Sequence, residues 1–106
     1  VERIEELLRA LPDEQASVEI VEGLLNVQLL LYQQELYRRA VPAGLKAVRW
    51  ARLLGDRPLL AKALTYRGAL AAENRELSIA FEAFIEALNS EQKRPGFVSF
   101  FFGYNY

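Results

Sequence analysis

The chain has 106 residues, a formal net charge of −1, 52% hydrophobic residues and 25% charged residues. These values are typical of one globular domain with a modest core, and the balanced charge gives no support to a nucleic-acid or membrane-surface role. Because the chain has no Cys and no His, disulfides, thiolate chemistry and the commonest general base and metal ligand are excluded.

The sequence also bears on where the protein is located and on whether the chain is a fragment. No apolar run is long enough to span a bilayer and no signal peptide is visible, so we expect a cytoplasmic protein. The chain lacks Met, starts at Val1 and ends without a helix-stop signal. We therefore expect residues 1–106 to be a single helical domain that is a fragment of a longer protein.

The first two predicted helices cover residues 2–11 and 14–36. Pro12 ends the first, because the residue before a proline is pushed out of the helical region. Asp13 is a plausible N-cap for the second, or Ser17 caps it and residues 14–16 stay in the loop. The second helix is apolar around most of its girth, which predicts cover on more than one side. The first carries an apolar stripe opposite the water-facing Glu5, formed by Ile4, Leu7, Leu8 and Leu11.

Local signals place the next helices at about 42–54, 58–72 and 76–90, with a sixth from about 96 onward. Pro42 suits a first helical position, where its missing N–H costs nothing. Gly55 is the expected C-terminal stop, and Asp56 and Pro58 mark the next start. A polar turn at 73–76 separates the last two of these helices.

Small residues are the most informative feature of these helices. Gly68 lies in mid-helix, where Gly costs about 1 kcal/mol relative to Ala, so it predicts a close approach of two helices near Ala80 and Phe84. An internal repeat is suggested when one stretch of the chain is aligned with a later stretch by the expected packing role of each residue, with an offset of 36 residues (80 − 44). This alignment pairs Gly44, Val48 and Ala51 with Ala80, Phe84 and Ala87.

The positions of Gly68, Ala80, Phe84 and Ala87 resemble the signature of the tetratricopeptide repeat, whose unit has about 34 residues. The resemblance covers about 25–106 and departs at Leu64 and at Ala71. It implies an all-α array of antiparallel helix–turn–helix repeats in a right-handed superhelix, with about two and a half units after an N-terminal helix. The junction 53–56 looks like versions found in bacterial transcription regulators and signalling enzymes. A helical bundle without repeats would give the same stripes.

In the resembled family, the first helices of successive units line a concave groove that holds a peptide or a protein. The resemblance therefore implies a protein–protein interaction scaffold, acting as a regulatory or oligomerisation segment of a bacterial multidomain protein. The implied partner-binding residues are Asn26, Leu29, Gln33 and Tyr37 in the first unit, Lys62, Thr65, Ala69 and Glu73 in the second, and Phe97, Phe100 and Tyr104 in the third.

Six aromatic residues between 97 and 106 lack a following helix that would enclose them. Since large uncovered apolar surfaces mark interaction sites, we expect a homodimer through this C-terminal aromatic helix. A helical self-association domain without a groove ligand is the alternative function.

No arrangement of residues indicates catalysis. Acids such as Glu5 and Glu6 lie where helix polarity predicts them, the serines lack a companion base, and phosphate-binding loops are absent. We therefore expect no enzyme activity, no metal site and no cofactor.

A basic stretch, residues 38–67, holds eight Lys and Arg residues and a single acid, Asp56. We interpret it as the complement of the acidic residues 1–35, and nucleic-acid binding is a less favoured alternative. Trp50 lies within it, where we expect it to half-bury against the adjacent unit or, alternatively, to anchor a partner.

Overall fold

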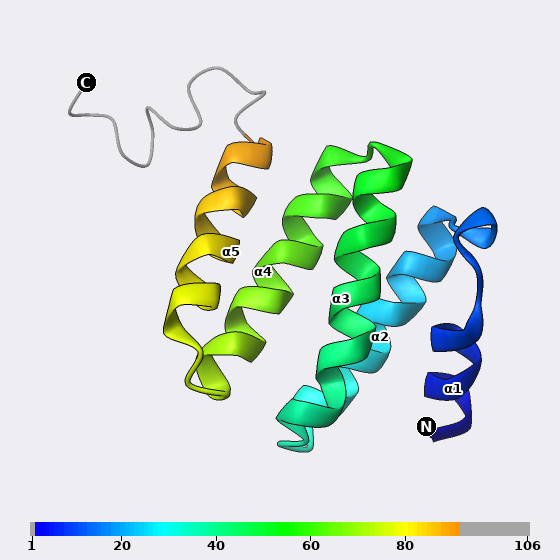
Figure 1. Ribbon diagram of the computed structural model, residues 1–106, viewed down its shortest axis with the longest axis horizontal. Coiled ribbons are helices and arrows are strands. Elements are labelled where there is room, and N and C mark those ends of the chain that lie inside the picture. Colours follow the sequence, from blue (N-terminus) through cyan, green and yellow to red (C-terminus); the bar gives the residue numbers. More distant parts are fainter. Residues whose placement is uncertain (1, 92–106) are drawn as a thin grey trace.

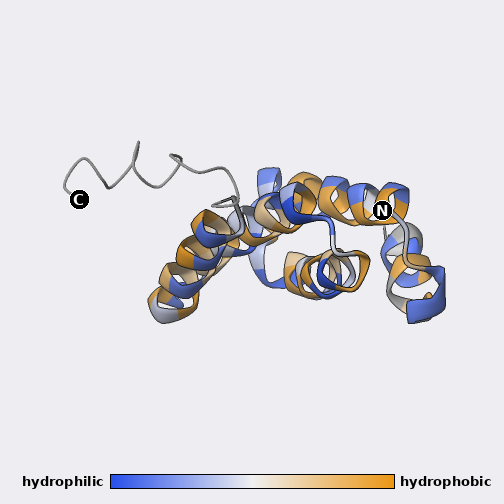
Figure 2. Cartoon of the chain, turned by 90° about the horizontal axis from the view of Figure 1, so that it is seen from above, coloured by the Kyte–Doolittle hydropathy of each residue, from blue (hydrophilic) through white to orange (hydrophobic). Residues whose placement is uncertain are grey.

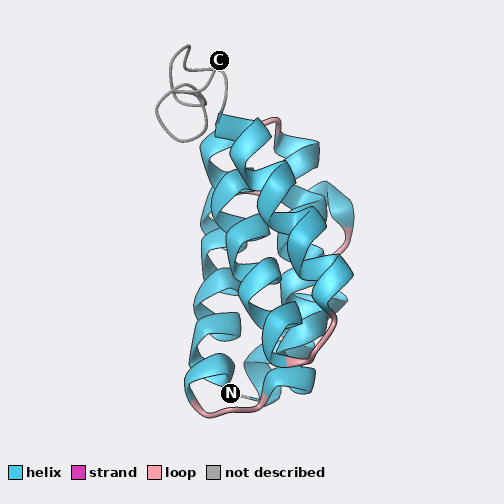
Figure 3. Ribbon diagram, turned by 90° about the vertical axis from the view of Figure 1, so that its left-hand side faces the viewer, coloured by secondary structure: helices cyan, strands magenta, loops and turns pink. Residues whose placement is uncertain are grey.

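The structure is a computed structural model that describes residues 2–91, and every regular element in that range is helical (Figure 1; Figure 3). The five predicted helices are confirmed, whereas the expected sixth helix lies outside the described residues. Their bounds are α1 Glu2–Ala10, α2 Val18–Gln33, α3 Tyr37–Leu54, α4 Arg57–Glu73 and α5 Leu77–Glu91, with a short 3-10 turn, η1 Asp13–Gln15, after α1.

In Figure 1, α1, α3, α4 and α5 lie side by side in a row. The helices α2 to α5 pack mainly against their neighbours in the chain, whereas α1 contacts α3 as well as α2. α2 lies behind α3 in this view and contacts α1, α3 and α4. The predicted cover on more than one side of α2 is therefore confirmed. No helix within residues 2–91 combines the length and the apolar composition that crossing a bilayer requires.

The hairpins α2–α3 and α4–α5 are closed by turns of the same geometry. The middle residue of each turn has a positive φ, 63° at Glu35 and 64° at Arg75. The closing hydrogen bonds also match, from Leu36 N–H to the Leu31 carbonyl at 2.9 Å and from Glu76 N–H to the Ala71 carbonyl at 2.8 Å. Since these turns are 40 residues apart (75 − 35), the sequence alignment with an offset of 36 is wrong.

Buried positions on the second helices of the two hairpins are also 40 residues apart. The buried small residues of α3 recur on α5, with Ala40, Ala43 and Ala47 matching Ala80, Ala83 and Ala87. The two hairpins therefore bury equivalent faces.

Gly68 of α4 lies where the Phe84 ring of α5 packs against α4. A Cβ atom at this position would lie 2.6 Å from Cε1 of Phe84, so the absence of a side chain lets the ring lie there. The predicted approach of Gly68 and Phe84 is confirmed. In the hairpin α2–α3 the glycine is on the second helix instead of the first, because Gly44 of α3 lies against the Gln28 side chain of α2.

Two predicted helix starts are wrong. α2 begins at Val18 and not at residue 14, and Ile20 N–H donates to the Ser17 hydroxyl oxygen at 3.2 Å. Of the two predicted N-caps, Ser17 is therefore confirmed and Asp13 is wrong. α3 begins at Tyr37 and continues through Pro42. A proline this near the helix start removes one intrahelical hydrogen bond, to the Arg38 carbonyl, and the buried face of α3 outweighs that loss.

The signals at the α3–α4 junction are confirmed. Gly55 ends α3 with a φ of 69°, and its N–H donates to the Ala51 and Arg52 carbonyls at 3.1 Å each. Asp56 caps α4 by accepting from Leu59 N–H at 3.0 Å. Pro58 lies in the first turn of α4.

The core lies where α2, α3 and α4 meet. Trp50 is fully buried there, so the expected half-burial is wrong. Its companions with the largest buried side chains are Leu24, Leu25, Leu31 and Leu64.

Polar contacts attach α1 to α3. Glu5, expected to face water, is 6% exposed and accepts from Arg39 Nε and Nη2 at 3.1 and 2.8 Å. Leu7, expected in the apolar stripe, is 58% exposed. Lys46 Nζ donates to the carbonyls of Leu8 and Leu11 at 3.2 and 2.8 Å, which supplies donors at the C-terminal end of α1.

Candidate partner-binding groove

The surface between α2 and α4 carries a hollow of about 240 Å³, which we call the α2–α4 hollow. Most of its lining is apolar or aromatic, and the remaining polar side chains are those of Gln28 and Thr65. The lining residues are Gln28, Leu29 and Tyr32 of α2 and Thr65, Tyr66 and Ala69 of α4. A concave apolar surface of this size suits an apolar side chain of a partner molecule.

Polar contacts flank this hollow toward its two ends. Lys62 Nζ donates to Glu22 Oε1 at 3.2 Å and lies 5.9 Å from the centroid of the Tyr66 ring. At the other end, the Tyr32 hydroxyl donates to Glu73 Oε2 at 3.2 Å. Because Glu22 and Tyr32 are ten residues apart on α2 (32 − 22), the two contacts are about 15 Å apart.

A pair of aromatic rings extends the second end. The rings of Tyr32 and Tyr37 meet edge to face, with centroids 5.3 Å apart and an interplanar angle of 68°. Burial, followed by the hydrogen bond to Glu73, raises the pKa of Tyr32. The Tyr32 hydroxyl therefore stays protonated, as a donor, near neutral pH.

Three residues of the predicted set meet in the α2–α4 hollow: Leu29, Thr65 and Ala69. Asn26 and Gln33 are exposed on α2 and do not line it. Of the predicted residues on α2, only Leu29 therefore lines this hollow.

The other predicted residues lie at the margins or beyond. Lys62 and Glu73 belong to the flanking polar contacts. Tyr37 is the first residue of α3, so its predicted place on the first helix of a unit is wrong. Phe97, Phe100 and Tyr104 lie outside the described residues.

Sequence reasoning missed Gln28, Tyr32 and Tyr66 in the lining. Tyr32 could have been found, because it follows Leu29 by three residues and so lies on the same helical face. Tyr66 is adjacent to the predicted Thr65. Gln28 gives only a weak signal, as one polar residue within an apolar run.

Four of the eight basic residues in the stretch 38–67 pair with acids from other helices. Arg39, Arg49 and Lys62 pair with the N-terminal acids Glu5, Asp13 and Glu22. Arg52 Nη2 donates to Glu86 Oε1 of α5 at 2.9 Å. The predicted complementarity with the acidic residues 1–35 is therefore confirmed for three of the basic residues.

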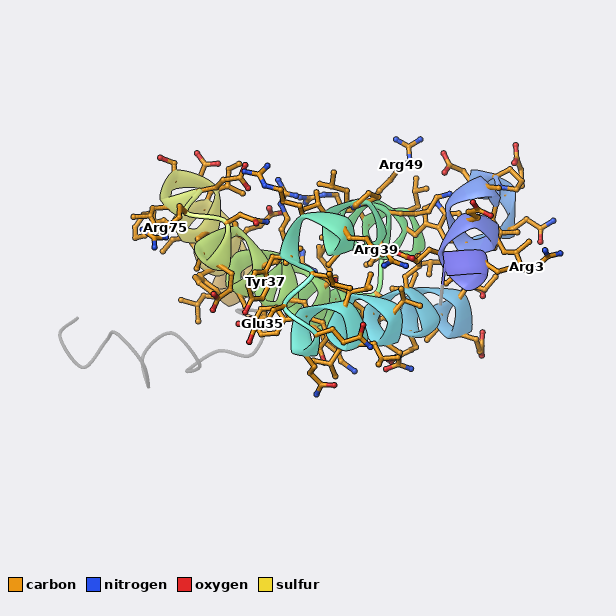
Figure 4. The ribbon with its side chains drawn as sticks, turned by 90° about the horizontal axis from the view of Figure 1, so that it is seen from below. Arg3, Glu35, Tyr37, Arg39, Arg49 and Arg75 are labelled. Carbon is orange, nitrogen blue, oxygen red and sulfur yellow. The ribbon has the colours of Figure 1, made fainter. Side chains whose placement is uncertain are left out.

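Figure 4 shows two of these basic residues in different settings. Arg39 extends from α3 to the Glu5 carboxylate of α1, and Arg49 reaches outward from α3. Across residues 2–91, no group of three or more acidic side chains is placed to hold a metal ion.

No protein-family model, no curated protein and no solved structure matches this chain.

Proposed function

We propose that this chain is a protein-interaction module, built from stacked helical hairpins, that holds a partner peptide in the α2–α4 hollow. The observation that carries the proposal is the hollow itself, which is apolar, open to solvent and lined by the first helices of two equivalent hairpins. A place within a bacterial multidomain regulator, as the resemblance implies, and a cytoplasmic setting belong to the same proposal.

The repeat-like features support this proposal with one adjustment. The offset of 40 residues between the two turns exceeds the tetratricopeptide unit of about 34. The additional length lies in the helices, since α3 has 18 residues and α4 has 17. The chain is therefore proposed as a tetratricopeptide-like array with lengthened units.

The partner is a peptide that places one large apolar side chain in the hollow. The distance of about 15 Å between the flanking polar contacts corresponds to four or five residues of extended peptide. Lys62 and Glu22 present both charges at one end, so the peptide needs no net charge. Specificity comes from the aromatic walls, Tyr32 and Tyr66.

A matched pair of variants tests this proposal. Leu29 is 39% exposed and lines the hollow, whereas the adjacent Leu30 is 44% exposed and does not. We expect peptides selected from a random library on the wild-type protein to bind Leu29→Asp at least tenfold more weakly, and Leu30→Asp unchanged. Equal binding by both variants, or a selection that enriches no peptide, would refute the proposal.

Self-association is the second candidate function, and a separate observation favours it. α5 forms one end of the row of helices (Figure 2). Four large apolar side chains on α5 are exposed at positions that share one helical face. They are Leu77 (68%), Phe81 (67%), Phe84 (38%) and Ile85 (39%). We propose a homodimer that covers this face together with the aromatic residues 97–106.

Sedimentation at tens of micromolar tests the homodimer. We expect Phe81→Glu to shift the protein to monomer, as would the Phe100→Glu, Tyr104→Glu double variant. Leu53→Glu is the matched control, because Leu53 is 58% exposed on α3. A wild-type protein that sediments as a monomer would exclude this function.

A further inference from the structure

Gln28 carries a buried amide that no described protein group satisfies. The side chain is 2% exposed, and neither Nε2 nor Oε1 has a hydrogen-bond partner among the described residues. The amide lies against Gly44, where an added Cβ would be 2.9 Å from Nε2. A buried amide without a partner has lost its water contacts, so a bound group that supplied a donor or an acceptor would be favoured.

A second hollow, of about 180 Å³, lies beside this amide, and we call it the α3–α4 hollow. It is lined by Gln28 and Gly44, and it shares only Gln28 with the α2–α4 hollow. Its volume resembles that of protein cavities of about 150 Å³ that take up benzene. Its aliphatic wall comes from three helices and consists of Val41, Leu45, Leu70 and Ile79.

Two groups of opposite charge complete the lining of the α3–α4 hollow. Arg67 lies on α4, and Glu76 lies in the turn before α5. Neither forms a salt bridge or a side-chain hydrogen bond with another described residue, although the charge of Arg67 also acts on Glu86. This sets the pair apart from Arg39, Arg49, Arg52 and Lys62, whose charges are matched within the molecule.

We propose that the α3–α4 hollow binds a free α-amino acid with an aliphatic side chain, such as leucine. Arg67 donates to the carboxylate and Glu76 accepts from the ammonium group. The aliphatic wall covers the side chain, and the Gln28 amide turns from Gly44 into the hollow to bond the ligand. This ligand site is separate from the proposed peptide site and does not rest on it.

The opposite charges of Arg67 and Glu76 together favour a zwitterionic ligand. A simple carboxylate would meet Glu76 as a repulsive neighbour, and a simple amine would meet Arg67 in the same way. An aliphatic amino acid satisfies both charges and also fills the apolar wall.

Calorimetric titration of the full chain tests the ligand class. We expect saturable binding of L-leucine, and binding at least tenfold weaker for 4-methylpentanoate, which lacks the ammonium group, and for 3-methylbutylamine, which lacks the carboxylate. Equal binding of leucine and 4-methylpentanoate would overturn the amino-acid assignment. The absence of saturable heat with leucine, isoleucine and valine at millimolar concentration would overturn the site.

Charge variants with matched controls test the residues. Arg67→Gln and Glu76→Gln should each weaken leucine binding at least tenfold, which corresponds to about 1.4 kcal/mol. Arg75→Gln and Glu82→Gln remove exposed charges that do not line the hollow, so they should leave binding unchanged. Equal losses in test and control variants would show only a general charge effect and would overturn the assignment.

Gln28→Met separates a ligand contact from a packing role. Met has a similar length and volume but no amide, so the fold is kept while the hydrogen-bonding groups are removed. We expect leucine affinity to fall at least tenfold while the unliganded variant unfolds at no lower temperature than the wild type. Unchanged leucine affinity would overturn the part assigned to Gln28.

Discussion

The indole Nε1 of Trp50 donates to Oδ1 of Asp13 at 2.8 Å, which joins the C-terminal part of α3 to the turn after α1. The same carboxylate accepts from Arg49, and Lys46 Nζ lies 5.0 Å from the centroid of the indole ring. The hydrogen bond from Arg49, followed by that from Trp50, lowers the pKa of Asp13 from 3.8 to about 2. The folded chain therefore favours the charged form of this carboxyl group.

The first prediction concerns acid unfolding. Because the pKa of Asp13 is lower in the folded chain than in the unfolded chain, its stabilising contribution is present above about pH 3.8 and is lost as the pH falls toward 2. We expect Asp13→Asn to flatten the dependence of stability on pH in this window. Trp50 is the only Trp, so its fluorescence during urea unfolding at each pH gives the measurement.

The neighbouring acid Glu14 provides the control for this experiment, since it is exposed in the same turn. Glu14→Gln should keep the wild-type pH profile. Some dependence should persist in Asp13→Asn, because Arg52 lowers the pKa of Glu86 in the same direction. Superimposable profiles for wild type and Asp13→Asn would contradict the role given to Asp13.

The second prediction concerns Gly68. Gly68→Leu should lower the free energy of unfolding by about 1–3 kcal/mol, because the new side chain would displace the Phe84 ring. Gly68→Ala gains about 1 kcal/mol of helix propensity but still meets the ring, so it should not be more stable than the wild type. Thermal unfolding followed by circular dichroism gives both values.

Two further variants isolate the cause at Gly68. Gly23 lies within α2 and has no atom within 4 Å of an added Cβ, so Gly23→Ala should stabilise the chain by about 1 kcal/mol. Gly68→Ala made on a Phe84→Ala background should stabilise by a similar amount, because the ring is gone. If Gly68→Ala alone stabilises as much as Gly23→Ala, the ring does not restrict this position.

The third prediction concerns the stability cost of the unpartnered Gln28 amide. Gln28→Met should raise the free energy of unfolding by about 1–3 kcal/mol in the absence of ligand, since it removes unsatisfied polar atoms from the interior. Gln33→Met changes an exposed residue on the same helix and should have an effect below about 0.5 kcal/mol. A marked loss of stability in Gln28→Met would mean that the amide has a partner.

The fourth prediction concerns the attachment of α1. Arg39→Gln should lower the free energy of unfolding by about 1–3 kcal/mol, because the nearly buried carboxylate of Glu5 would lose its charged partner. Arg38→Gln, at the preceding position, alters an exposed side chain and should change stability by less than about 0.5 kcal/mol. Chemical denaturation distinguishes the two, and equal effects would contradict a specific pair.

Helix boundaries set by local chemistry could be predicted from the sequence. Gly55 and Asp56 act through bonds to residues three or four positions away, so the chain around them suffices. Pro42 misled the prediction, because the burial of Ala40 and Val41 against other helices keeps the residues before it helical. The offset of 40 was missed because it is expressed in turn geometry, while the small residues also allow an alignment at 36.

The candidate sites were predictable only in part, for a similar reason. Leu29 and Thr65 followed from helical spacing and the resemblance, since exposed positions on first helices recur regularly. The pairing of Glu5 with Arg39 depends on which face of α1 meets α3, and residue spacing within α1 does not contain that information. Gln28 joins two hollows only because Gly44, on another helix, leaves room for its amide.

The order of the helices in the row has a consequence for how the chain opens. α5 packs mainly on α4, and α1 packs on α2 and α3, so either end can detach without separating the helices around Trp50. Amide hydrogens of α1 and α5 should then exchange with solvent through partial opening, while those near Leu24 and Trp50 require global unfolding. Such a gradient along the row means that a ligand bound between α3 and α4 would slow exchange in the interior helices more than at the two ends.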